Sequence, residues 1–377
     1  MTEKYMFFFL KTGGGHLSTA KSVSEKIKTE VNGNIEIELA DGLNGSKKFL
    51  KYILEDGYRN SISYAEWIYN LLYAIHKFNF VSKITVSLIS FFLKPHIERQ
   101  ILEKQPDKIA IFHFFLVKPI SEIIKRNKLN IPVITVVTDP FTAPPIWFLQ
   151  KNQKYIVFSE ILKQKCIEKG LNEGNFKVYP FPLDSKYSQN LTDFEKEKIR
   201  INLGFNQNSK IILIIGGGEG MPRGMKILKN ILSKNMEGEI AIVCGKNAKL
   251  FRRAINIKNR FKLQNLKVYG FVDFIHSLIS ISDVVVTKCG PSTVMEILLM
   301  GKVPVINNYI WEQEKGNMEF VCNNQMGILE RKIQRLPNLL YKLISDEQFY
   351  KSITNNIKNA HLSNGVGMVS DYILNYR

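Results

Sequence analysis

The N-terminal half of the chain alternates short apolar segments with amphipathic ones. Residues 5–10 are an apolar run that stops at a glycine-rich turn, followed by a helix-like segment at 18–30 and a second strand-like run at 35–39. Apolar runs bounded by turn residues and separated by helical patterns are typical of βαβ units. Further strands are predicted at 108–115, 132–138 and 154–159.

The same pattern restarts near residue 210. A strand at 210–215 runs into Gly216-Gly-Gly, 203 positions after Gly13-Gly-Gly, and strands follow at 239–244, 266–269, 283–287 and 303–306. The repetition predicts an α/β fold of two Rossmann-like domains in tandem, 1–188 and 189–377, with the last helix packing back on the first domain. In such proteins we expect the ligand in the cleft between the domains, at the carboxyl ends of the strands.

The charge balance narrows the classes of partner. The 377 residues include 52 Lys+Arg and 34 Asp+Glu, a formal net charge of +18. This favours nucleic acid, an anionic membrane surface or phosphate-bearing ligands. Residues 1–190 carry 26 basic and 18 acidic side chains, and 191–377 carry 26 and 16. Because the charge is evenly spread and no nucleic-acid-binding motif occurs, we expect no nucleic-acid partner.

Several cofactor classes are not expected. The four cysteines are far apart and form no CxxC motif, so we expect reduced thiols and no metal site. Neither glycine turn has the third glycine of the dinucleotide fingerprint, and neither a P-loop nor an Asp-x-Asp motif occurs. No apolar stretch approaches the ~20 residues of a spanning helix.

The segment 283–305 carries the strongest signal. It is predicted as a strand, a turn, a helix opening near Ser292 or Thr293, and a second strand. The free N–H groups of such a helix start bind anions. Thr293-x-x-Glu296 also fits a capping box, which leaves a purely structural explanation open for both residues.

Taken in order, the motifs of the chain resemble those of monogalactosyldiacylglycerol synthases and processive diacylglycerol glucosyltransferases. The resemblance rests on segments spread over most of the chain: 13–16, 138–148, 216–220, 244–247, 269–272, 288–296 and 313–317. It implies a two-domain GT-B fold, with a lipid-acceptor-binding first domain and a UDP-sugar-binding second domain. It also implies transfer of a hexose to diacylglycerol without a cofactor or metal. The segment 307–317 is similar to the galactosyl branch and favours UDP-galactose slightly over UDP-glucose.

The resemblance also assigns residues to the donor. They follow the predicted strands of the second domain and should contact the uracil, the ribose, the diphosphate and the sugar. In that order they are Phe271 and Val272; Glu296; Gly217, Gly218, Ser292 and Thr293; Gln313 and Glu314. Asn247 either faces the nucleotide or is a turn residue.

The implied reaction is an inverting displacement that needs a base beside the acceptor hydroxyl. His16 is the expected base, because it follows the first glycine turn at a helix start; capping or phosphate contact is the alternative. Asp139 is expected as a second base or as the partner of His16. Gly14, Gly15 and Trp147 are expected at the acceptor, although Trp147 is also compatible with a core position. Relatives carry a histidine where this chain has Pro144, so whatever that histidine contributes in the relatives is missing here.

Residues 67–97 are expected to contact an anionic membrane surface. They contain 19 apolar residues out of 31, with three lysines, two histidines and no acid. Core helices are the alternative. We therefore expect a cytoplasmic protein that is peripheral on the inner face of the cell membrane. A sterol or polyprenyl-carrier transferase, a UDP-sugar epimerase and a non-catalytic sugar-nucleotide sensor remain competing hypotheses.

Overall fold

The structure is a computed structural model. It describes residues 2–11, 14–31, 33–46, 51–52, 54, 79–150, 152–189, 191–234, 236–310 and 313–377. The chain divides into two compact units. Unit 1 comprises Met1–Ser185, Ile310–Gln313 and Asn364–Arg377, and unit 2 comprises Lys186–Tyr309 and Glu314–Ser363. Gly13 and residues 67–78, the first part of the predicted membrane segment 67–97, lie outside the described residues.

Unit 1 contains a six-stranded parallel sheet of order β2-β1-β3-β4-β5-β6. Its strands are β1 (Glu3–Phe9), β2 (Ile35–Asp41), β3 (Lys108–Ile111), β4 (Val133–Val136), β5 (Lys154–Val157) and β6 (Phe176–Val178). The last five residues of β1 are buried. A parallel sheet covered by helices on both faces requires such continuous apolar strands, which explains the uninterrupted run in the sequence.

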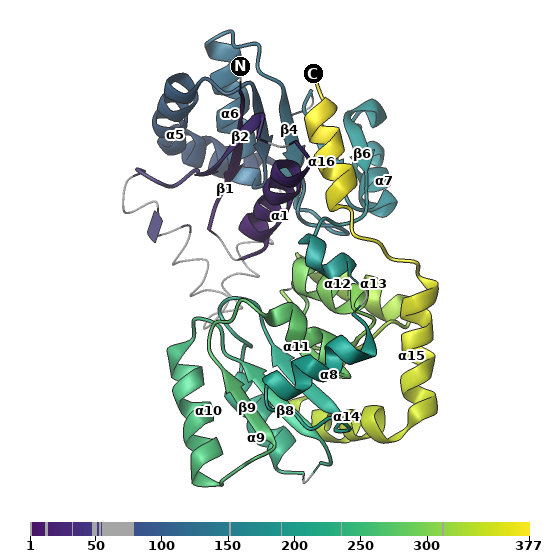
Figure 1. The fold of residues 1–377 in the computed structure, drawn as a ribbon. Helices are drawn as coiled ribbons and strands as arrows, with labels where there is room; N and C mark the ends of the chain where they lie inside the picture. The colour runs from purple at the N-terminus through teal and green to yellow at the C-terminus, as the bar shows by residue number, and fades with distance from the viewer. Residues whose placement is uncertain are drawn as a thin grey trace. The chain divides into compact units, whose positions relative to one another are not determined.

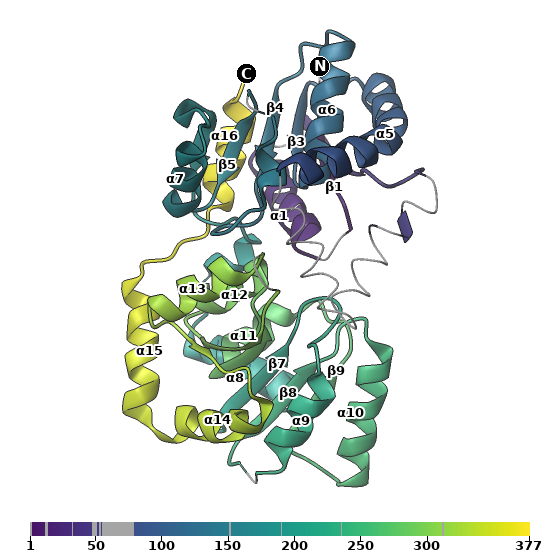
Figure 2. The ribbon, with the colours of Figure 1, turned by 180° about the vertical axis from the view of Figure 1, so that it is seen from behind.

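Helices cover both faces of this sheet (Figures 1 and 2). They are α1 (Gly15–Glu30), α5 (Asn79–Lys104), α6 (Phe114–Arg126), α7 (Glu160–Glu168) and α16 (Val366–Asn375), with short 3-10 turns at Pro145–Phe148 (η2) and Glu173–Asn175 (η3). A further 3-10 turn, η4 (Ser185–Ser188), lies where unit 1 passes into unit 2. The C-terminal helix α16 packs against α1. Lys108 of β3 anchors the C-terminal end of α16. Its Nζ atom donates hydrogen bonds to the carbonyls of Ile373 (2.7 Å) and Leu374 (2.8 Å).

Unit 2 has a second six-stranded parallel sheet, of order β12-β11-β10-β7-β8-β9. Its strands are β7 (Ile211–Ile215), β8 (Glu239–Val243), β9 (Leu266–Tyr269), β10 (Val284–Lys288), β11 (Val303–Asn308) and β12 (Ile328–Leu329). The surrounding helices are α8 (Asp193–Asn202), α9 (Gly224–Leu232), α10 (Ala248–Arg260), α11 (Ile275–Ile281), α12 (Pro291–Leu299), α13 (Lys315–Asn323), α14 (Leu336–Ser345) and α15 (Glu347–Asn359), with a 3-10 turn at Ile333–Arg335 (η5).

Two details differ from the sequence prediction. The strand predicted at 108–115 ends at Ile111, because the His113 side chain accepts a hydrogen bond from the Phe115 amide and caps α6. The short strands β6 and β12 were not predicted; three and two residues are too few to show a period.

Both sheets reverse their strand order beside the strand that carries the glycine turn. In unit 1 the chain leaves β1 for β2 and then returns to the other side of β1 with β3. In unit 2 it leaves β7 for β8 and β9 and returns beside β7 with β10. At such a switch point the loops after the two central strands separate and leave room for a ligand. The candidate sites are therefore the carboxyl ends of β1 and β3 and of β7 and β10.

Candidate functional site

His16 lies at the switch point of unit 1. It is the second residue of α1, whose N-cap is Gly14, and its side chain is 7% exposed. The position around Gly14 is open, since a Cβ atom added there would meet nothing within 4 Å. The turn therefore leaves backbone exposed beside a buried imidazole.

The hydrogen bonds of His16 fix its tautomer. The Nδ1 atom lies 2.9 Å from the carbonyl oxygen of Phe112, which follows β3, and 2.7 Å from Thr138 Oγ1, which follows β4. A carbonyl oxygen can only accept, so Nδ1 carries the proton and donates it. The lone pair of the neutral ring is therefore on Nε2, the nitrogen that could remove a proton from a substrate.

Burial keeps this imidazole neutral. It lowers the pKa of His16 to about 4, an effect that the hydrogen bond to Phe112 only partly offsets. The start of α1 acts in the same direction, because a helix N-terminus disfavours a cation. A second imidazole, His113, packs at 4.5 Å between ring centroids, and burial together with His16 holds its pKa well below the usual 6.5.

Asp139 and Trp147 form a second buried pair close to this group. Asp139 Oδ2 accepts a hydrogen bond from Trp147 Nε1 at 2.8 Å, and Oδ1 accepts from Gln313 Nε2 at 3.3 Å. Trp147 is fully buried, with its ring 6.4 Å from that of His16. The core position left open by the sequence is thus the observed one. The side chain that contacts His16 Nδ1 is Thr138, the neighbour of Asp139.

In unit 2 the glycine turn after β7 packs tightly against the turn after β8. A Cβ atom on Gly220 (φ +74°) would lie 2.5 Å from the Cys244 carbonyl oxygen, and one on Gly245 (φ +57°) 2.3 Å from the Gly218 carbonyl oxygen. These two positions therefore require glycine. Gly217 and Gly218 are exposed. The packing of these two turns leaves the backbone of Gly217 and Gly218 accessible at the switch point of unit 2.

The helix predicted near Ser292 is α12, and it begins at Pro291 with Gly290 as its N-cap. Ser292 and Thr293 are in its first turn, where amides have no partner within the helix. The capping box is not formed, because the N-cap is a glycine without a side chain. Ser292 Oγ is buried without a hydrogen-bond partner. The start of α12 therefore offers both amides and a hydroxyl to a ligand.

Lys288, which the sequence analysis did not single out, lies at the same switch point. It ends β10, where the pairing with β11 shifts register between Thr287 and Lys288. Its Nζ atom is 3.2 Å from Oε1 of Glu314, a carboxylate that is 4% exposed. A polar residue closing an apolar strand before a glycine was the signal that could have identified it.

Other residues predicted to contact the donor lie on neighbouring segments of unit 2. Asn247 caps α10, with Oδ1 accepting from the Leu250 amide at 2.9 Å, which is the turn role left open by the sequence. Phe271 is 66% exposed, and the Lys246 Nζ atom lies 5.6 Å from its ring centroid. Val272 follows it, and Glu296 is on α12, one turn after Ser292.

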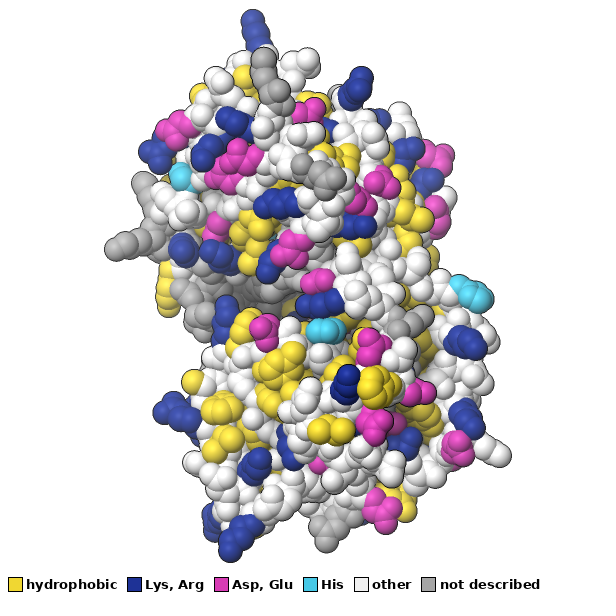
Figure 3. Space-filling view, viewed as in Figure 1, with side chains coloured by type: hydrophobic (Ala, Val, Ile, Leu, Met, Phe, Trp, Pro, Cys, Tyr) yellow, Lys and Arg dark blue, Asp and Glu magenta, His cyan; other side chains and the backbone are white. Residues whose placement is uncertain are grey.

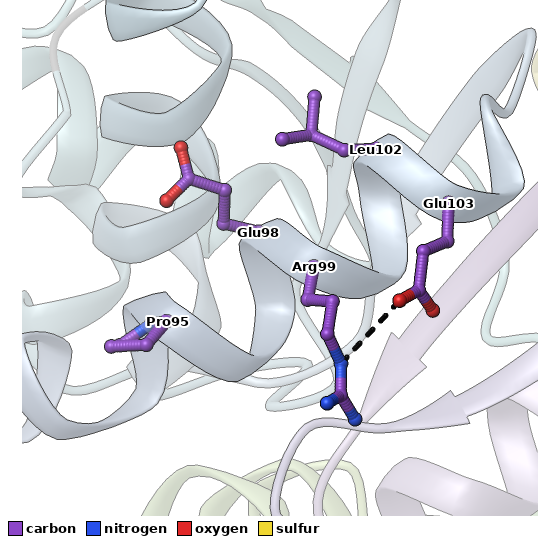
Figure 4. Close-up of a pocket in the computed structure, with 5 residues that line it drawn as sticks. All are labelled: Pro95, Glu98, Arg99, Leu102 and Glu103. Atoms are coloured by element: carbon purple, nitrogen blue, oxygen red, sulfur yellow. Dashed lines mark ion pairs between the residues drawn. The ribbon is translucent and has the colours of Figure 1, made fainter.

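Two further surface features do not add to these sites. A hollow on α5 is lined by Pro95, Glu98, Arg99, Leu102 and Glu103, with Arg99 paired to Glu103 at 3.6 Å (Figure 4). None of the predicted site residues line it.

Basic and acidic side chains are interspersed over the face shown in Figure 3. Among the described residues, no group of three or more His, Cys, Asp or Glu side chains could hold a metal ion.

Comparison with known proteins extends over most of the chain. Residues 16–183 match the family model of monogalactosyldiacylglycerol (MGDG) synthase, and residues 211–364 match the glycosyltransferase family 28 C-terminal domain. A probable chloroplastic monogalactosyldiacylglycerol synthase of Nicotiana tabacum is 24% identical over 92% of this chain and 65% of its own length. A processive diacylglycerol beta-glucosyltransferase of Bacillus pumilus is 26% identical over 96% of this chain and 91% of its own.

The fold has solved counterparts as well. The crystal structure of Anabaena Alr3699/HepE in complex with UDP-glucose aligns with a TM-score of 0.58 and 15% identity, covering 98% of each chain. Two parallel six-stranded sheets, each with its switch point, thus make this protein a member of the GT-B fold class. Within this fold class, the two family models match the chain one after the other, the first over residues 16–183 and the second over residues 211–364. In sequence the chain is similar to monogalactosyldiacylglycerol synthases and to processive diacylglycerol glucosyltransferases over most of its length.

Proposed function

We propose that this protein transfers a hexose, galactose or glucose, from a UDP-sugar to the hydroxyl of diacylglycerol by an inverting single displacement. The observation that carries the proposal is the neutral His16 imidazole, whose tautomer leaves the Nε2 lone pair available at the switch point of unit 1. The names of the relatives from tobacco and Bacillus pumilus support the choice of diacylglycerol as acceptor.

In the proposed reaction the acceptor oxygen attacks the anomeric carbon of the donor while its proton passes to His16 Nε2. The carbon–oxygen bond to the β-phosphate breaks, and its electron pair leaves with UDP. Gly14 and Gly15 accommodate the acceptor. Trp147 holds Asp139, whose carboxylate supplies negative charge near the imidazolium as it forms.

Unit 2 is proposed to bind the donor. The amides of Gly217, Gly218, Ser292 and Thr293 meet the diphosphate, with Ser292 Oγ as a further donor. Glu296 accepts from the ribose hydroxyls, Phe271 and Val272 hold the uracil, and Glu314 binds the sugar. Gln313, which belongs to unit 1, is also proposed to bind the sugar. Asn247 supports this surface from the cap of α10. No metal or cofactor is part of the proposed site.

The membrane-facing surface is proposed to be the first half of α5. Ile84, Leu88, Phe91 and Phe92 are exposed and recur at helical spacing, whereas Ile89 and Leu93 on the other side of the helix are buried in the core. Phe91 is 70% exposed. Lys94 and Lys118 approach a single carboxylate, that of Glu122, and leave net positive charge beside this stripe. An apolar stripe with a basic border suits an anionic bilayer surface.

The proposed location is the cytoplasmic face of the cell membrane. All four cysteines are free, and free thiols are compatible with a reducing compartment. Among the described residues, no helix is long and apolar enough to cross a bilayer. Flotation with phosphatidylglycerol vesicles tests the surface. Binding that is lost in high salt or in neutral vesicles supports the electrostatic attraction, and binding that ignores both contradicts it.

The transfer itself is tested with UDP-galactose and UDP-glucose against diacylglycerol, a sterol and a polyprenyl phosphate in the same vesicles. Mass spectrometry identifies the lipid product, and NMR gives its anomeric configuration. We expect a β-linked hexosyl diacylglycerol from the α-linked donor. A product on the sterol or the polyprenyl phosphate would show that diacylglycerol is not the acceptor. Pro144, which stands where relatives carry a histidine, is one reason to include these lipids. Isomerised free UDP-sugar without a lipid product would instead indicate an epimerase, and UDP binding without turnover a sensor.

The role of His16 is tested by His16→Gln, with His361→Gln as a matched control because His361 is an exposed histidine. General-base catalysis contributes ~10²–10⁴-fold, so His16→Gln should lose that factor in kcat while binding UDP normally. The control should retain full activity. Turnover unchanged in His16→Gln would remove this residue from the mechanism.

A further inference from the structure

The position of Lys288 places a cation at the centre of the switch point of unit 2. The Nζ atom would lie 3.5 Å from a Cβ atom added to Gly290, the N-cap of α12. The Cε atom would lie 3.9 Å from a Cβ atom added to Gly217, in the turn after β7. The same amine is 3.2 Å from Glu314 Oε1. Two turns without side chains thus border a charged pair.

Without a ligand, not every polar group at this point has a partner. The start of α12 is the positive end of a helix of nine residues, and it disfavours a neighbouring cation. Lys288 is nevertheless held beside it, with Glu314 as its counter-ion. Ser292 Oγ, in the first turn of α12, is buried without a partner. An anion entering here would satisfy the amine, the helix terminus and the hydroxyl together.

We propose that Lys288 binds the β-phosphate of the sugar nucleotide and acts as a catalytic residue by neutralising the charge that develops on UDP as it leaves. This inference rests on the proposed function, since it requires a UDP-sugar donor. As the bond from the anomeric carbon to the phosphate oxygen breaks, the electron pair moves onto that oxygen. The ammonium group meets it there, and the proton of the acceptor goes to His16.

The pairing with Glu314 explains how the amine is kept in place before the donor arrives. A lone lysine side chain samples many rotamers, whereas a contact to a buried carboxylate restricts it. When the diphosphate binds, Lys288 lies between two anionic groups, and Glu314 keeps a carboxylate oxygen for the hydroxyls of the sugar. Preorganised cations of this kind act most strongly where water is excluded.

The test compares ligands that differ by one phosphate. Calorimetry gives the Kd of UDP and of UMP for the wild-type protein, Lys288→Met, Lys288→Arg and the control Lys351→Met. Lys351 is an exposed residue of α15 that pairs with Glu347. We expect Lys288→Met to weaken UDP by ~10–100-fold with UMP within about twofold, and to lower kcat by ~10²–10³-fold. Lys288→Arg should retain most of the UDP affinity, and Lys351→Met should match the wild type.

A second variant covers the case in which Lys288→Met does not fold, because removing one partner leaves a buried charge unpaired. The double variant Lys288→Met/Glu314→Gln removes both charges, and its ratio of UDP to UMP affinity should fall in the same way. A ratio unchanged from wild type in either folded variant overturns the role of Lys288 alone. Wild-type protein that binds neither nucleotide overturns the donor assignment as well.

Discussion

Lowering the pH should destabilise unit 1 through His16, because the folded protein holds this imidazole neutral. Burial lowers its pKa from 6.5 to about 4. A group with a depressed folded-state pKa binds protons more readily in the unfolded chain. For a histidine, the neutral form is then favoured by folding. Its contribution is complete above the unfolded value of 6.5 and is lost as the pH falls from there towards 4.

The size of the effect follows from the two pKa values. At ~1.4 kcal/mol per pH unit, the difference between 6.5 and about 4 corresponds to a total of about 3 kcal/mol. By pH 5 the unfolded histidine is almost fully protonated and the folded one is not. About 2 kcal/mol of the free energy of unfolding should then be lost relative to pH 7. His113 shifts in the same direction and adds to the loss in the wild type.

Urea unfolding of the wild type and His16→Gln at pH 7 and pH 5 measures this quantity. The glutamine variant keeps a polar side chain that does not titrate. Trp147 lies in unit 1, close to His16, and its fluorescence reports on this unit. Replacing Trp67 and Trp311 by phenylalanine in both proteins leaves Trp147 as the only indole. The loss between pH 7 and pH 5 should be about 2 kcal/mol greater in the protein that retains His16.

An equal loss in the two proteins would refute the reasoning, since it would mean that His16 titrates alike in the folded and unfolded chains. The pH dependence of turnover gives an independent check. Because the free protein already holds His16 neutral, kcat/KM should not fall near pH 6.5 and should decline only as the pH approaches about 4. A decline centred at 6.5 would indicate an ordinary, solvated histidine.

Three other variants probe the scaffold and the membrane surface. Gly245→Ala places a Cβ atom 2.3 Å from the Gly218 carbonyl oxygen, so it should displace the turn, weaken UDP binding at least ~10-fold and cost about 1–2 kcal/mol by thermal unfolding. Lys108→Met leaves two carbonyls of α16 without their donor, and should speed hydrogen exchange in that helix and cost about 1–3 kcal/mol. Phe91→Ser should reduce flotation with anionic vesicles, whereas Leu102→Ser, an exposed residue at the C-terminal end of the same helix, should not. Equal effects would contradict the assigned surface.

Much of the architecture could be predicted because parallel strands buried on both faces leave a strong local signal. Five consecutive apolar residues in β7, followed by three glycines, define a strand and its turn without any tertiary information. The predicted ends were less accurate where one side chain decides them. His113 lies within an apolar run and shows its capping role only through its contact with the Phe115 amide.

The sequence by itself determined the α/β class, the repeated strand–glycine–helix plan, the place of His16 at a helix start and the helix that begins near Ser292. These features are local, since each depends on residues within a few positions of one another. Only the tertiary structure decided which nitrogen of His16 carries the proton, that Trp147 donates to Asp139, and that Lys288 meets Glu314 beside the start of α12. Those contacts join residues 96, 8 and 26 positions apart. They exist because each sheet reverses its strand order, and the carboxyl ends of neighbouring strands then meet at one edge.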